Sequence, residues 1–300
     1  MNTSMEHSQA MQLQWTPSPH VSAMHTAWCV THFPQSAARL NAEWPAAAAA
    51  LDALADEFKT THERYWDQML SLASTADGSR ELAERLCARL GQTTGTLPSR
   101  LAALLNQCRR LFESSFPKFA SDIPLRSGPI RQMWEAHGVG LMRMLARQTG
   151  ESVLVEQATV LLVQPVLGGF GYAHLSANRI HWEALLTHVD PQLPETLRIA
   201  WLLSQLDLDR PVFSDKINAH RLRSVAGLAM LPAILEAGQE LELCRFSPES
   251  LANAFELWHC ESLQVGAADT LDLLSTWWET YQASRPPWPV ALAVLDKMLV

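Results

Sequence analysis

The residues best suited to metal chemistry lie in one short stretch of this 300-residue sequence, between His174 and His188. His174, His181 and Glu183 are ligand types for zinc, and His188 follows a few residues later. A catalytic zinc needs three protein ligands and one open position, and two histidines with one carboxylate are an acceptable set. The stretch therefore predicts one candidate function, a metal-dependent hydrolase that uses zinc.

A β-hairpin would bring these ligands together. Residues 172–183 alternate in polarity, and a two-residue turn centred on Ala177 and Asn178 would place His174 opposite His181. A three-residue loop would break that register. Because half of a hairpin usually faces water, we prefer the interpretation that the polar face is solvated and binds no metal. This polar face comprises Tyr172, His174, Ser176, Arg179, His181 and Glu183, and the apolar face comprises Ala173, Leu175, Ile180 and Trp182.

The segment Gly168-Gly169-Phe170-Gly171 could present backbone N–H groups to an anion. A phosphate loop normally runs into the N-terminus of a helix, however, and here the pattern continues as a strand. The segment also matches neither the Walker A motif nor the dinucleotide-binding fingerprint. We therefore interpret it as a strand-to-strand turn whose glycines adopt positive φ.

The segment from Trp134 to Gly140 contains two candidates for acid-base catalysis, Glu135 and His137. These two residues are two positions apart, so they do not share a helix face. Gly138 and Gly140 lie inside a strong helical pattern, where each glycine costs about 1 kcal/mol relative to alanine. Close packing of another backbone against this helix is the preferred explanation, and an approaching ligand is the alternative.

Other catalytic signatures are missing from the sequence. There is no Gly-x-Ser-x-Gly elbow, and no cysteine lies in a recognisable catalytic context. His62 and Glu63 begin like the metal-binding motif His-Glu-x-x-His, but Trp66 stands where the second histidine is required. The preferred function is therefore a non-catalytic role in binding or assembly, with no cofactor expected.

The charge distribution bears on the kind of partner. The net charge is −8, and residues 1–150 carry 14 basic and 13 acidic groups whereas residues 151–300 carry 9 and 18. This acidic balance argues against binding of nucleic acid. One of Trp277 and Trp278, together with Trp288, could form an exposed patch for a protein partner, but internal packing of these tryptophans is the preferred interpretation.

Cysteine usage and hydropathy indicate the compartment. The five cysteines are odd in number, widely spaced and without a Cys-x-x-Cys pair, which fits neither a disulfide framework nor a thiolate zinc site. Residues 1–14 are polar and show no export signal. The longest apolar runs are far shorter than the roughly 20 residues of a membrane span. We therefore expect a protein of the cytoplasm that does not enter a membrane.

Periodicity predicts a mainly α fold of the α+β class, with many helices and a small antiparallel β hairpin or sheet inserted around residues 152–190. Residues 1–38 show no period and are expected to form a flexible N-terminal arm. Residues 39–150 are expected to be helical, and residues 151–300 to contain the β segment and a C-terminal helical region, in one core or two. The predicted helices cover 41–69, 79–91, 96–117, 127–150, 194–206, 215–237, 248–259, 269–283 and 289–299.

Residues 159–206 resemble the core of the zincin metallopeptidases in the order of their elements. A buried strand at 159–163 is followed by a glycine-containing turn, an alternating edge-type strand at 178–182 and then a helix. In zincins this helix carries His-Glu-x-x-His, whereas the closest positions here read Arg198-Ile199-Ala200-Trp201-Leu202. The resemblance therefore implies a zincin-like shell that lacks the family's metal ligands and general base.

Overall fold

The computed structural model describes residues 11–93, 95–150, 154–175, 177–206, 208, 210–260, 263 and 265–300. Over these residues the chain forms thirteen α-helices, one 3₁₀ helix and a four-stranded sheet. The predicted mainly α fold of the α+β class is confirmed. Every helix in the described part of the chain is too short or too polar to span a bilayer.

The chain divides into two compact units that are interleaved in sequence. Unit 1 comprises Met1–Gln14, Arg131–Thr159 and Asp190–Val300, and unit 2 comprises Trp15–Ile130 and Val160–Val189. These boundaries differ from the consecutive ranges 1–38, 39–150 and 151–300 expected from the sequence. The boundary between the units falls inside two strands of the sheet and inside one long helix.

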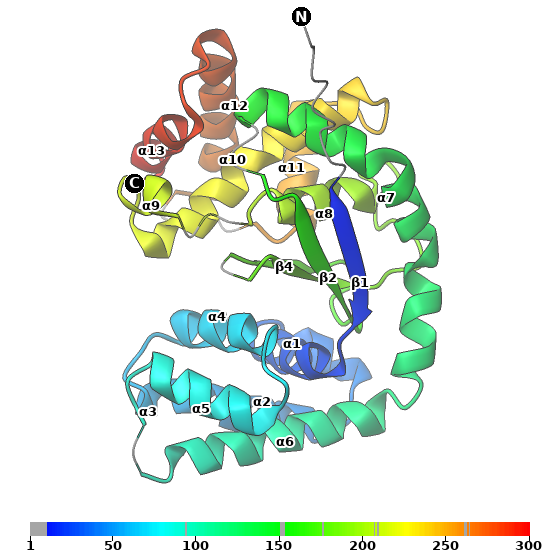
Figure 1. Ribbon diagram of the computed structural model, residues 1–300, viewed down its shortest axis with the longest axis vertical. Coiled ribbons are helices and arrows are strands. Elements are labelled where there is room, and N and C mark those ends of the chain that lie inside the picture. The colour runs from blue at the N-terminus through cyan, green and yellow to red at the C-terminus, as the bar shows by residue number, and fades with distance from the viewer. Residues whose placement is uncertain are drawn as a thin grey trace, which may run out of the picture. The chain divides into compact units, whose positions relative to one another are not determined.

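The sheet has the strand order β1-β2-β4-β3 (Figure 1). β1 runs parallel to β2, because the Gln12 amide donates to the Glu156 carbonyl and the Ser18 amide donates to the Leu162 carbonyl, both at 3.0 Å. In the strand order β4 lies between β2 and β3, whereas the sequence pattern suggested an edge-type strand at 178–182. The strands are β1 (Gln12–Pro17), β2 (Gln157–Val163), β3 (Gly171–His174) and β4 (Arg179–Glu183).

The hairpin of β3 and β4 keeps the predicted faces but shifts the predicted register by two residues. Tyr172 pairs with His181, and His174 pairs with Arg179 instead of His181. The reason is the loop, which has four residues between the strands and ends on Asn178 in the left-handed region at φ 47°. A shift of two residues moves each partner along the strand without turning its side chain to the other face.

The prediction of a flexible arm is wrong for residues 12–32. They form β1 and helix α1 (Pro19–His32), which begins after Ser18, whose side chain accepts from the Val21 amide. The run from Val21 to Ala27 is buried without interruption. A helix covered on all sides has no amphipathic period, and this is why the sequence pattern gave no helical signal here.

The remaining helices of unit 2 follow the predicted apolar stripes but differ from the prediction in their bounds: the segment expected to be one helix over 41–69 forms three, and the helix expected over 127–150 begins at Phe119. The long helix expected over 41–69 is divided near Lys59, which adopts φ 53°, and a new helix begins after Thr61, whose hydroxyl accepts from the Arg64 amide. α1 packs against α2, α4 and α6. The bounds are η1 (Pro34–Arg39), α2 (Trp44–Asp52), α3 (Leu54–Glu57), α4 (His62–Ala73), α5 (Ser79–Arg89), α6 (Leu97–Ser115) and α7 (Phe119–Thr149), which continues into unit 1.

Unit 1 is built around α10, which packs against α8, α9, α11, α12 and α13. The five helices predicted after residue 190 are all present, and the short α9 is added. The bounds are α8 (Glu195–Leu203), α9 (Pro211–Ser214), α10 (Ala219–Glu240), α11 (Pro248–Leu257), α12 (Ala267–Ser284) and α13 (Trp288–Met298).

The preferred interpretation of internal packing is confirmed and the alternative of an exposed tryptophan patch is wrong, since Trp277, Trp278 and Trp288 are all 3% exposed or less. α12 is covered on two sides, by α10 and by α13. The Trp277 indole donates to the Ala291 carbonyl on α13 at 3.0 Å, and the Trp278 indole donates to Glu236 on α10 at 2.8 Å. Adjacent tryptophans can therefore both be buried.

Candidate functional site

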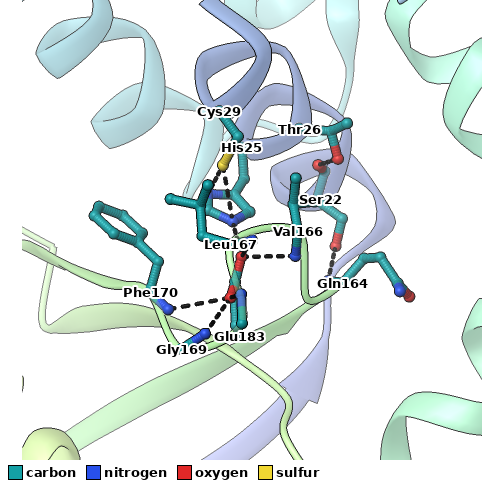
Figure 2. Close-up of polar contacts among 11 residues, drawn as sticks. Ser22, His25, Thr26, Cys29, Gln164, Val166, Leu167, Gly169, Phe170 and Glu183 are labelled. Carbon is teal, nitrogen blue, oxygen red and sulfur yellow. Dashed lines mark hydrogen bonds and ion pairs between the residues drawn. The ribbon is translucent and has the colours of Figure 1, made fainter. Parts of the chain in front are cut away.

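The described ligand-type side chains that converge most closely lie inside unit 2, where α1 meets β4. His25 and Cys29 are four residues apart on α1, so they project from the same face of the helix. Glu183 is the last residue of β4. Ligand atoms of these three side chains lie within 4.8 Å of one another, and all three residues are fully buried (Figure 2).

The carboxylate of Glu183 is surrounded by donors. Its Oε1 accepts from His25 Nε2 at 2.9 Å and from the amides of Val166 and Leu167 at 2.8 Å. Its Oε2 accepts from the amides of the next three residues, 168–170, at 2.6 to 3.1 Å. Figure 2 shows this loop wrapped around the carboxylate. Six donors therefore fix the position of one buried carboxylate.

These contacts determine the ionisation of the cluster. Burial by itself would raise the pKa of the Glu183 carboxyl, but the hydrogen bond and charge of His25 and the loop amides together lower this pKa to about 2. Burial, and then the charge of Glu183, raise the pKa of the Cys29 thiol well above its usual value. At neutral pH the cluster therefore contains a carboxylate and a neutral thiol.

The arrangement does not match a nucleophilic cysteine site. Cys29 Sγ lies 3.4 Å from His25 Nε2 and 3.7 Å from Nδ1. The nearer nitrogen is the one that already contacts Glu183. In a Cys-His-carboxylate site, thiol and carboxylate contact opposite ring nitrogens, and the thiol pKa is lowered, not raised. The thiol and the carboxylate here converge on one nitrogen.

The polar face of the hairpin is buried at its three candidate ligands, so the preferred interpretation of a solvated face is wrong there. Tyr172 and Arg179 on the same face are half-buried, and Ser176 lies outside the described residues. His174, His181 and Glu183 are all 0% exposed. His181 Nδ1 lies 3.2 Å from His174 Nε2, and the His181 ring lies 5.1 Å from the His25 ring, between centroids. The structure thus brings the three predicted ligands into one neighbourhood. His188 is only half-buried and lies in the segment after β4.

The glycine loop does bind an anion, and that anion is the carboxylate of Glu183. Gly168 and Gly169 adopt φ 87° and 135°, as expected for a turn that needs positive φ. The same backbone turns successive N–H groups toward one point. The two interpretations of this segment, a turn and an anion-binding loop, therefore both describe it.

The acid-base candidates of α7 do not form a site together. Glu135 is exposed and pairs with Arg131 one turn earlier at 3.1 Å, and His137 is half-buried. A Cβ at Gly138 would lie 2.4 Å from the Trp134 ring, and one at Gly140 would lie 3.2 Å from Leu241. Packing therefore explains both glycines, although side chains and not another backbone occupy the space.

Sequence reasoning missed His25 and Cys29 because both lie in the segment taken for a flexible arm. The available signal was their spacing, since a histidine and a cysteine four residues apart share a helix face.

Comparisons of the chain with protein-family models, with curated proteins and with solved structures found no match.

Proposed function

We propose that this chain acts in binding or assembly and has no catalytic site of its own. The observation that carries this proposal is that helix α13 has apolar side chains on two sides, one buried and one exposed. Its inner side buries Ala291, Leu292 and Leu295, whereas Val290 and Val294 on another side are 40% and 48% exposed. Because exposed apolar side chains that lie together on a surface mark contact sites, this outer side of α13 favours contact with another molecule.

The burial of the hairpin histidines also supports a non-catalytic role. A zinc hydrolase keeps one metal position open to water and substrate. His174, His181 and Glu183 are 0% exposed, and the Glu183 oxygens already accept six donors of the chain itself. A hydrolase that uses these residues with His188 stays a prediction without a favouring observation.

The charge of the C-terminal sequence that includes α13 indicates the chemistry of the partner. Residues 236–300 contain ten acidic and three basic residues. A complementary partner is a protein with an apolar patch surrounded by basic residues. Attraction of this kind speeds association and weakens with added salt.

The test compares proteins bound by the immobilised full chain and by two variants. Val290→Glu combined with Val294→Glu places charge on the outer face of α13, and Val189→Glu is the control because Val189 is 41% exposed in unit 2. The expected partner binds the original chain and the control but not the double variant. Its binding, repeated with the two purified proteins, weakens with salt. If all three chains bind the same proteins with equal affinity, the proposal is wrong.

A further inference from the structure

We propose that His25, Cys29 and Glu183 form a binding site for a thiophilic divalent cation, with zinc as the fitting ion. This inference is independent of the proposed function, because it concerns the interior of unit 2 and makes no use of α13.

The distances are close to those of a metal centre. With the usual zinc bonds to nitrogen, oxygen and sulfur, tetrahedral ligand atoms lie about 3.3 Å apart for nitrogen and oxygen and about 3.6 Å apart for sulfur and nitrogen. Here His25 Nε2 lies 2.9 Å from Glu183 Oε1 and 3.4 Å from Cys29 Sγ. These two separations are within a few tenths of an ångström of the zinc values, and the third, between Cys29 Sγ and a Glu183 oxygen, is no more than 4.8 Å. A shift of about 1 Å or less would therefore admit the ion.

The surroundings hold the ligands in place. Five backbone amides fix the Glu183 carboxylate, as the outer contacts of a metal ligand do. The His25 ring stacks on Phe170, with centroids 5.5 Å apart and an interplanar angle of 18°. An ion would replace one of the three donors at Oε1, the His25 N–H, and leave both amides on that oxygen. Little of the existing network is lost.

The charges balance when the ion binds. The Cys29 thiol gives up its proton to solvent and coordinates through the thiolate. His25 also releases its Nε2 proton to solvent, coordinates through Nε2 and keeps a proton on Nδ1. One thiolate, one carboxylate and a divalent cation then sum to zero in a fully buried site. A neutral cluster avoids the cost of an uncompensated charge in the interior.

The donor set indicates which ions fit. One sulfur, one imidazole nitrogen and one carboxylate oxygen suit zinc, whereas magnesium and calcium prefer oxygen ligands alone. Cobalt(II) accepts the same donors, and its spectrum reports both a thiolate ligand and a tetrahedral geometry.

The experiment uses the full chain after chelator treatment. Native mass spectrometry with zinc measures the number of ions per chain, and titration with cobalt measures the thiolate-to-cobalt charge-transfer band. We expect one ion per chain and a charge-transfer band that saturates at one equivalent. Zinc should displace cobalt and abolish this band, whereas magnesium should not.

Two matched variants locate the ion. Cys29→Ala removes one ligand, and Cys108→Ala removes another fully buried thiol of unit 2 that lies outside the cluster. The band should disappear in Cys29→Ala, with at least about a tenfold loss of zinc affinity, and persist in Cys108→Ala. The proposal is overturned if the chelator-treated original chain binds no zinc or cobalt, or if the band survives in Cys29→Ala.

Discussion

Replacement of Glu183 by glutamine should strongly destabilise unit 2, because glutamine keeps the shape of glutamate but not its two acceptor oxygens. Each Glu183 oxygen accepts three donors. In one orientation the new NH2 group faces the amides of residues 168–170. In the other orientation it faces His25 and the amides of Val166 and Leu167. Either way, three donors lose their acceptor, and each set includes at least one buried donor, His25 or the amides of Gly169 and Phe170.

The magnitude follows from the number of donors left without a partner. A buried polar group that loses its partner costs about 1 to 3 kcal/mol, so three rigid donors would cost up to about 9 kcal/mol. Loops relax, however, and breaking a buried charged pair typically costs about 3 to 5 kcal/mol. We expect Glu183→Gln to lower the free energy of unfolding by this smaller amount, a large share of the stability of an ordinary domain.

The assay is urea unfolding of chelator-treated protein, combined with hydrogen exchange of the amides of residues 166–170. Exchange resolves unit 2 even if the two units unfold in separate steps. Glu135→Gln is the control, since the exposed ion pair of Glu135 with Arg131 contributes little. A loss of less than about 1 kcal/mol in Glu183→Gln, with unchanged exchange of these amides, would refute the account of the carboxylate given above.

Three further outcomes test other features of the structure. Gly138→Ala should destabilise the protein by about 1 to 2 kcal/mol in thermal unfolding, because its Cβ would lie 2.4 Å from the Trp134 ring. Gly140→Ala should destabilise the protein less, because its Cβ would lie 3.2 Å from the flexible end of Leu241. Equal effects of the two substitutions would contradict this reasoning. Gly169→Ala should cost about 1 to 3 kcal/mol, since alanine rarely adopts φ 135°, and a neutral result by denaturant titration would argue against the loop conformation. Burial raises the pKa of Cys244 to about 11. The rate of its alkylation, measured by mass spectrometry, should therefore be low at pH 7 and rise about tenfold per pH unit below that pKa. A rate that does not change between pH 7 and 10 would be inconsistent with this value.

The sequence by itself determined most helices and the faces of the hairpin. Apolar residues three and four apart predict a helix with one buried stripe. Capping residues mark where helices begin, as Ser247 does before α11 by accepting from the Ser250 amide. Alternation likewise placed Tyr172 and His181 on one face of the hairpin, and Ala173 and Ile180 on the other. These signals are local, so they can be read from a short window.

The tertiary structure alone decided which groups meet and which are buried. α1 carries no stripe because it is covered on several sides, so neither the helix nor His25 and Cys29 could be identified from their pattern. His174, His181 and Glu183 on the polar face of the hairpin are buried, although alternation suggested that this face is in water. His25 contacts Glu183 across 158 positions of the chain. Local periodicity reports how side chains point, whereas long-range packing determines what they point at.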